Sequence, residues 1–569
     1  MLANAAHTVL ATPELLLLVS AHLAPHDLAQ CLRVCKDWSH QLEPILWADF
    51  CPKENKHESW NDASMRAALI RNLPLIRTAK IPVTKVFLLE LLIHDSETDP
   101  SARCTNLTRL EFENSRVEIG ISPFTHFSDD DVDLASDQLA TLLELNDRLT
   151  HLKLPCEFID TDAPLDALSN LDHLQHLTVV SPEDCEGNGA ISNFLRACLP
   201  LPRLTELVFD LDQTWDKHTW STRKLRTIIQ KASKERFSRN PTATKIKSLR
   251  LPSNCYGKWN PLPLLLLKSN LLDLESCEIP CFDEATDPQE LERVVREQCL
   301  NLKHLTCPSL SQQEQDGHHM AAFLRGCSGI QSFASKYFCD HAHGFEPRRI
   351  MSTLVSHHYK TLEVLELMQC RQMNSADQQE VLSRCRQLKR FWVMNSLGWC
   401  SSIGFKFEDI WSKDWACMEL TKLGLTLDQF FIINPALGMR EAEEKEFIAN
   451  VARRVYTQIG RLQKLEVLAL DIDTSKRSKA KPSDYAWDLT LSKGWLSEMA
   501  GLRRLKSLSQ PEAFWSKMGH AEVEFIYEHW PSLKEINLQG HILQMSAQSP
   551  WLWLLSKRPQ LQLVFKHAM

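Results

Sequence analysis

The amino-acid sequence predicts an α/β solenoid, with parallel strands on its concave face and helices outside, preceded by a small all-α domain. Three observations lead to this prediction. The first fifty residues form short amphipathic helical patterns, the rest of the chain repeats the pattern L-x-x-L-x-L, and helical patterns lie between the copies. With 569 residues, the chain is too long for one ordinary core, so it needs several domains or an array that grows lengthwise.

Composition and charge narrow the class of protein. Hydrophobic residues make up 44% and charged residues 24%, as in an ordinary folded chain, and the net charge of −8 gives no whole-protein argument for binding nucleic acid or a membrane surface. The 18 cysteines include no C-x-x-C pair, which suits a reducing compartment. The apolar stretch "ELLLLVSAHL" lacks the basic region of a signal peptide. We expect an intracellular protein, cytoplasmic and/or nuclear, without nucleic-acid or membrane partners.

The first fifty residues predict two or three short helices. Pro13 suits a first helical turn, and Thr12 before it suits an N-cap. Two apolar stripes follow, made of Leu16, Val19 and Leu23 and then of Leu28, Leu32 and Cys35. Trp38, Trp47 and other bulky apolar residues come next. A module of about 40 residues cannot bury so many large side chains alone, so we expect it to hide the excess against a partner.

This stretch resembles the F-box. Its pattern has a Leu-Pro opening, an apolar first helix, Asp-Leu, Val-Cys, a tryptophan and a later tryptophan. The sequence departs from it at Thr12, where the family usually has leucine. The matching positions are Pro13, Leu16, Leu23, Asp27, Leu28, Val34, Cys35, Trp38 and Trp47. The resemblance implies an F-box domain over residues 8–50. It also implies that Thr12 and all of the matching positions except Asp27 contact or support a Skp-type adaptor.

Cys31 and Cys35 have an alternative interpretation as metal ligands, because they lie on adjacent turns of one helix. His26 and His40 are nearby side chains that could complete a tetrahedral site. We interpret both thiols as small packing side chains.

The L-x-x-L-x-L pattern continues to the end of the chain. Clear copies begin at residues 107, 149, 174, 204, 246, 302, 330, 362, 388, 420, 465 and 533, and weaker copies at 271, 502 and 561. The steps from 149 to 174 and from 362 to 388 are 25 and 26 residues, close to the period of a leucine-rich repeat. The step of 45 from 420 to 465 indicates an insertion or an undetected repeat.

Helical patterns between the copies read as helix, short turn and strand. Such units cannot bury their apolar faces alone and must stack, with strand leucines such as Leu149, Leu152 and Leu154 in one core. Cysteines fit this scheme. We expect Cys277 and Cys370 to follow strands, and we expect the following cysteines to end helices: Cys198, Cys299, Cys327 and Cys385. We expect a helical linker or cap over residues 51–100 and a leucine-rich-repeat horseshoe over 101–569.

An F-box followed by leucine-rich repeats resembles the F-box/LRR family, and the C-x-x-L-x-x-L joints resemble those of its fungal and animal members, from which we expect a fungal-like member. The resemblance implies the substrate-recognition subunit of an SCF-type cullin–RING ubiquitin ligase. The F-box would bind the Skp-type adaptor, and the solenoid would bind a protein target. Such a subunit is not an enzyme and needs no cofactor, because it acts by bringing target and ubiquitin together.

Residues 215–247 are basic within an acidic chain and form a helical pattern. A solvated basic face is one interpretation, and a surface for an acidic or phosphorylated target is the other. The candidate target-binding residues are Arg223, Lys224, Arg226, Lys231 and Arg236.

Other motifs give weaker hypotheses. "CDHAH" at 339–343, with the histidine pairs at 318 and 357, is a possible metal cluster of unusual spacing, and a solvated loop is favoured. "SKRSKAKPS" at 475–483 is either an exposed loop or a nuclear localisation signal. We find no catalytic motif. Two alternative functions stay open: an F-box/LRR scaffold without ubiquitin transfer, and a ligand-sensing receptor.

Overall fold

The computed structural model divides the chain into two compact units, residues 1–254 with 269–273 and residues 255–268 with 274–569. The structure describes residues 12–52, 63–93, 103–113, 129–155, 158, 161–181, 194–195, 197–211, 245–251, 267, 271–279, 282, 286–309, 317–337, 347–368, 375–394, 409, 413–428, 441–473, 489–492, 495–511, 518–539 and 550–566. Each unit is described by itself.

The first unit begins with three helices and continues as an α/β solenoid. The helices of the opening module are α2 (Pro13–Ser20), α3 (Pro25–Cys31) and α4 (Lys36–Ala48). The strands are β1 (Asp49–Phe50), β2 (Thr78–Pro82), β3 (Arg109–Glu113), β4 (His151–Pro155), β5 (His176–Ser181), β6 (Glu206–Leu211) and β7 (Ser248–Arg250). The other helices are α5 (Ala63–Asn72), α6 (Leu88–Leu92), α7 (Asp129–Leu145) and α8 (Asp162–Ser169), with short 3₁₀ turns η2 (Leu73–Leu75) and η3 (Val83–Lys85). Each strand pairs in parallel with the next from β1 to β7.

The second unit repeats the same alternation. Its strands are β8 (Ser276–Glu278), β9 (His304–Ser309), β10 (Ser332–Tyr337), β11 (Val364–Met368), β12 (Arg390–Met394), β13 (Lys422–Asp428), β14 (Val467–Asp473), β15 (Ser507–Pro511), β16 (Glu535–Gln539) and β17 (Gln562–Lys566). Its helices are α12 (Pro288–Gln298), α13 (His318–Gly326), α14 (Pro347–His357), α15 (Ser375–Arg384), α17 (Glu441–Gly460), α18 (Trp495–Glu498), α20 (His520–His529) and α21 (Pro550–Lys557). Neighbouring strands from β8 to β17 are parallel.

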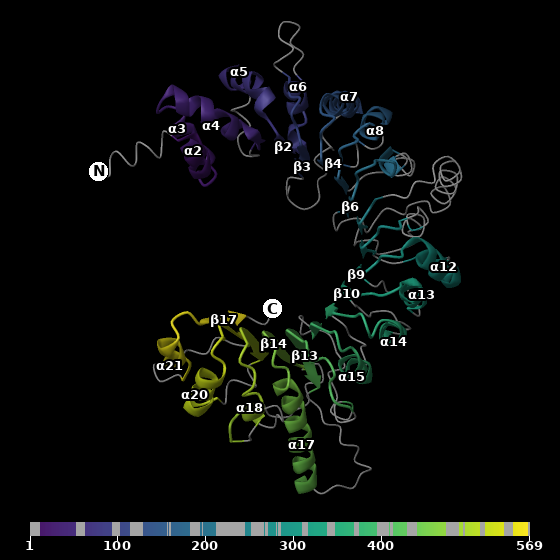
Figure 1. Ribbon diagram of the computed structural model, residues 1–569, viewed down its shortest axis with the longest axis vertical. Helices are drawn as coiled ribbons and strands as arrows, with labels where there is room; N and C mark the ends of the chain where they lie inside the picture. The colour runs from purple at the N-terminus through teal and green to yellow at the C-terminus, as the bar shows by residue number, and fades with distance from the viewer. Residues whose placement is uncertain are drawn as a thin grey trace. The chain divides into compact units, whose positions relative to one another are not determined.

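Within each unit the helices cover one face of the strands (Figure 1). Strand side chains alternate between the two faces, so the leucines of the repeat point toward the helices and the intervening residues lie on the other side, which we call the open face. Leu149, Leu152 and Leu154 are at most 2% exposed, as predicted, and Leu365 is fully buried. The leucine-rich-repeat solenoid predicted from the sequence is therefore confirmed.

The repeats tolerate insertions without losing strand register. The step from 420 to 465 contains the long helix α17, and β13 nevertheless pairs directly with β14. This step is therefore an insertion within one repeat and not an undetected repeat. The acidic segment that begins α7 lies in a similar long step, and there β3 pairs directly with β4.

The region 51–100, expected as a helical linker or cap, contains α5 and α6 but also strand β2. That strand pairs with both β1 and β3, so the sheet begins before residue 101. The sequence pattern missed β2 because Ala79 replaces the leucine, in register with Leu110.

Cysteines fill positions that leucine fills elsewhere. Cys299, Cys327, Cys385 and Cys417 each lie five residues before the first residue of the next strand, the place of Leu171 and Leu462 in other repeats. Cys277 differs from expectation, because it lies within β8 in register with Leu305 and is 1% exposed. Cys370 lies outside the described residues. Among the described helices, none is both long and apolar enough to cross a membrane.

Candidate functional sites

The opening helices form a small module with its own core. Leu16 on α2, Leu28 on α3 and Leu42 on α4 are its buried centre, and Cys31 and Trp38 pack against it. Proline occupies the first turn of α2 and of α3, where its missing N–H costs no hydrogen bond. Thr12 takes the N-cap position, as predicted, and its carbonyl accepts hydrogen bonds from the N–H groups of Leu15 and Leu16.

Several apolar side chains stay on the outside of this module. Leu17 and Leu18 on α2 are 44% and 64% exposed, and Val34, which precedes α4, is 63% exposed. Val19, expected in the buried stripe of α2, is also 44% exposed. Ser20 takes the inner place instead, since it is 2% exposed and its hydroxyl donates to the carbonyl of Leu17 at 2.7 Å. The sequence analysis did not select Leu17 or Leu18.

The nine residues expected to bind or support the adaptor fall into three groups by burial. Two are buried in the module core: Leu16 and Leu28. Four are partly buried: Thr12, Leu23, Trp38 and Trp47. Three are exposed: Pro13, Val34 and Cys35. The buried pair can support an interface only by shaping the helices, whereas the exposed residues are available for direct contact. Their role in binding an adaptor stays a prediction.

The two cysteines of the module differ in environment. Cys31 is partly buried against the core, while Cys35 is exposed at the N-cap of α4. Among the described residues, no three His, Cys, Asp or Glu side chains converge as a metal site would require. The contacts of Cys31 support its interpretation as a packing side chain.

Cysteines in the repeats are shielded from reaction. Burial raises the pKa of Cys104, Cys299, Cys385 and Cys417 to about 12. Because the thiolate is the nucleophile and the metal ligand, these thiols have little of either reactivity at neutral pH.

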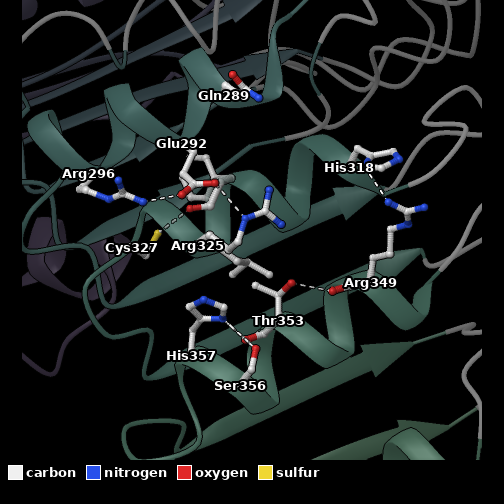
Figure 2. A network of polar contacts seen from close by, with 12 residues as sticks. Gln289, Glu292, Arg296, His318, Arg325, Cys327, Arg349, Thr353, Ser356 and His357 are labelled. Atoms are coloured by element: carbon white, nitrogen blue, oxygen red, sulfur yellow. Dashed lines mark hydrogen bonds and ion pairs between the residues drawn. The ribbon is translucent and has the colours of Figure 1, made fainter.

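A network of polar contacts links the helices of three consecutive repeats, α12, α13 and α14 (Figure 2). Arg325 Nε donates to Glu292 Oε2 at 2.8 Å, and Arg296 contacts the same carboxylate from one helical turn away. Burial alone would raise the pKa of Glu292, but Arg325 and then Arg296 outweigh it, so the pKa lies below its usual value. This arrangement ties neighbouring repeats together and is a structural feature.

The histidines of the suggested metal cluster have separate partners. His318 Nδ1 lies 2.9 Å from Arg349 Nη1, and His319 Nε2 lies 2.7 Å from the carbonyl oxygen of Thr286. His358 is fully buried and bonded to backbone groups of the preceding repeat. Residues 339–343 lie outside the described part of the chain.

Histidines also meet on the open face of the first unit. The rings of His151 and His176 stack with centroids 4.2 Å apart, and His176 Nδ1 lies 2.7 Å from Glu206 Oε2. Burial lowers the pKa of His151, and the neighbouring His176 and Arg109 add to this. The arrangement can bind polar groups. The Thr150 hydroxyl lies 2.8 Å from His151 Nδ1, and it donates to the carbonyl of Thr108 at 2.8 Å, which fixes it to the neighbouring repeat.

The basic segment expected to bind a target falls outside the described residues. This applies to all five candidate positions: Arg223, Lys224, Arg226, Lys231 and Arg236. The segment 475–483 lies outside them as well. Both hypotheses stay predictions.

Comparison with known proteins identifies the class of the opening module. The model of the F-box-like family matches residues 13–53. The chain therefore contains an F-box-like domain followed by leucine-rich repeats. A search of curated proteins finds no match. The fungal-like character of the repeat joints stays a prediction.

Several solved structures are similar to the chain at low sequence identity. The Rad7–Elc1 complex from yeast is 13% identical with a TM-score of 0.37, over 89% of this chain and 88% of that chain. A leucine-rich-repeat protein of Leptospira interrogans is 12% identical with a TM-score of 0.31, over 81% and 90%. LegL7 from Legionella pneumophila is 11% identical with a TM-score of 0.28, over 75% and 91%. The fold assignment rests on the strands and helices described above.

Proposed function

We propose that this chain is the substrate-recognition subunit of an SCF-type cullin–RING E3 ubiquitin ligase. The F-box-like module binds a Skp-type adaptor and, through it, the cullin and RING subunits. The solenoid binds the protein to be ubiquitinated. The chain itself makes and breaks no bond and requires no cofactor. Its contribution is to hold a target lysine near a ubiquitin-loaded enzyme, which raises the effective concentration of the reacting groups.

The observation that carries this proposal is the exposed apolar surface of the F-box-like module. Leu17, Leu18, Val19 and Val34 are each more than 40% exposed, next to a core already filled by Leu16 and its partners. Several large apolar side chains left exposed on one small module indicate a site of protein association. A partner that covers it gains the free energy of removing these side chains from water.

Adaptor binding is tested with substitutions on this surface. Leu18→Asp and Val34→Asp place a charge where an adaptor would bury the side chain, while leaving the module core unchanged. Loss of a buried anchor commonly costs about 2 kcal/mol or more, so co-purification of a Skp-type adaptor should fall at least about tenfold. Leu134→Asp is a matched control, because Leu134 on α7 is 59% exposed in the same unit. If both variants retain adaptor as the control does, this surface does not bind it.

Ubiquitin transfer separates the ligase subunit from a scaffold. Affinity purification followed by mass spectrometry should compare the intact chain with a chain lacking residues 8–50. Adaptor and cullin should vanish on deletion, while targets bound by the solenoid stay bound and accumulate. A reconstituted complex that binds a target but transfers no ubiquitin to it would favour the scaffold.

A further inference from the structure

The open face of the second unit carries Trp392, whose indole packs closely against the next strand. Phe391 and Val393 of β12 point into the core and are 0% and 5% exposed. Trp392 between them therefore points to the open face, where it is half-buried. On the next strand, Gly424 is its register partner. A Cβ atom at residue 424 would lie 2.7 Å from both Cδ2 and Cε3 of the Trp392 indole. Glycine is thus what allows the indole to approach β13 so closely.

A second neighbour fixes the same ring. Lys422 Nζ lies 4.3 Å from the centroid of the Trp392 ring, a distance at which a cation is attracted to the aromatic face. The same ammonium group lies 3.5 Å from Glu366 Oε1 on β11. The indole is consequently held by backbone on one strand and by an ion-paired lysine. An aromatic side chain that is already ordered loses little conformational entropy when it binds a partner.

The charges around Trp392 leave a positive surplus. Lys422 is paired with Glu366, and Lys389 Nζ lies 2.7 Å from Glu363 Oε2. Arg390 is exposed two residues before Trp392 on the same face, and it makes no ion pair with any residue that the structure describes. Met368 on β11 is 37% exposed and lies in register with Met394, two residues beyond Trp392, so it adds apolar surface on the side of the indole away from Arg390. An arginine beside a rigid tryptophan matches the composition of the residues that dominate protein interfaces.

We propose that this open-face surface, formed by Arg390, Trp392, Met368 and Lys422, binds a protein segment in which an acidic side chain lies beside a bulky apolar one. The apolar side chain packs on Trp392 and Met368. The carboxylate pairs with Arg390, whose planar guanidinium accommodates two carboxylate oxygens. That the segment belongs to a ubiquitination target rests on the proposed function above.

A phage-displayed library of random twelve-residue peptides, selected on the full chain, supplies the probe. Enriched peptides should carry Asp or Glu within two residues of Leu, Met, Phe or Trp. The affinity of the best peptide, measured by fluorescence anisotropy, should fall at least about tenfold for Trp392→Ala and for Arg390→Glu. Basic enriched peptides, or a library that yields no peptide sensitive to Trp392→Ala, would overturn the proposal.

Matched controls exclude general effects of the substitutions. Trp553→Ala removes a half-buried tryptophan from α21, and Arg503→Glu reverses an exposed charge in the same unit. Neither should change peptide affinity by more than about twofold. An equal loss for either control would show that the effect is not specific to the open-face surface.

Gly424→Ala tests the position of the indole without removing it. The new methyl group must displace the ring, so affinity should fall about tenfold. In the Trp392→Ala background, the same change should have a much smaller effect, because the closest contacts of the new methyl group are with the indole at 2.7 Å, ahead of Met394 Sδ at 3.0 Å. Equal losses in both backgrounds would show that Trp392 does not form the binding surface. Thermal unfolding of the single variants provides the folding check.

The same variants separate this inference from the proposed function. Trp392→Ala should retain the adaptor fully, whereas Leu18→Asp should retain the peptide fully. If the chain proves not to bind an adaptor, the peptide measurements still test the open-face surface. If peptide affinity does not respond to Trp392→Ala, the adaptor measurements still test the proposed function.

Discussion

Asn146 is predicted to hold two consecutive repeats of the first unit together. It is 1% exposed, its Oδ1 accepts from the N–H of Leu107 at 2.8 Å, and its Nδ2 donates to the carbonyl of Cys104 at 2.8 Å. Leu107 and Cys104 are themselves buried, at 1% and 0%. Asn146→Ala leaves both backbone groups without a partner. An unsatisfied buried group costs about 1–3 kcal/mol, so we expect local stability to fall by about 2–4 kcal/mol.

Hydrogen exchange is the suitable assay, because a repeat protein need not unfold in one step. The Leu107 amide should exchange about 100-fold faster in the variant, since each 1.4 kcal/mol is a factor of ten. Asn170→Ala is the control: Asn170 makes a similar bond, Nδ2 to the Asp166 carbonyl at 3.1 Å, but it is exposed. That change should cost less than about 0.5 kcal/mol. Exchange at Leu107 that stays within threefold of wild type would refute the argument.

Two further predictions concern titratable side chains. His358 accepts from the Ile330 N–H at Nδ1, at 3.2 Å, and donates from Nε2 to the Leu324 carbonyl, at 2.9 Å, so it must be neutral in the fold. Burial lowers its pKa below the ordinary value of 6.5, so the unfolded chain binds the proton first and stability falls as pH drops below 6.5. Urea unfolding of wild type from pH 7 to pH 5 should show this slope, and His358→Gln should flatten it; equal slopes would contradict it. For the cysteines, N-ethylmaleimide at pH 7.5 should modify Cys35, which is exposed, and spare Cys299 until the chain is unfolded; mass spectrometry of the modified peptides checks this, and early labelling of Cys299 would contradict its burial.

Much of the fold was predictable because the repeat pattern encodes it directly. Each L-x-x-L-x-L copy predicted from the sequence coincides with a strand, including the weak copies at 271, 502 and 561, which became β8, β15 and β17. Weak copies still form strands because each repeat stacks on its neighbours. Where one leucine is missing, pairing with the neighbouring strands sets the register. The pattern missed β2, where Ala79 takes a leucine position. It found β8, but Cys277 was expected after that strand and instead takes a leucine position within it.

The candidate site was less predictable because exposure depends on tertiary packing. The run of four leucines in α2 surrounds the helix, so periodicity alone cannot choose the face that is buried. In the structure Leu16 and Ser20 face inward, and Leu17, Leu18 and Val19 stay outside. Matching to the F-box pattern selected Leu16 and Leu28, which build the core, and overlooked the neighbouring side chains that remain available for binding.

The repeat pattern does not constrain the residues of the open face. Their side chains can therefore be selected for binding a partner. Leucine at the core positions of β12 and β13 would satisfy the fold whatever side chains lie between them. Glycine is a poor choice for a strand interior and is destabilising by roughly 0.5–1 kcal/mol relative to alanine. Gly424 nevertheless lies in the middle of β13, where any Cβ atom would collide with Trp392. The position of the tryptophan thus requires a residue that the strand itself disfavours. A residue that its own strand disfavours is expected at a functional site, where a particular geometry takes precedence over local stability.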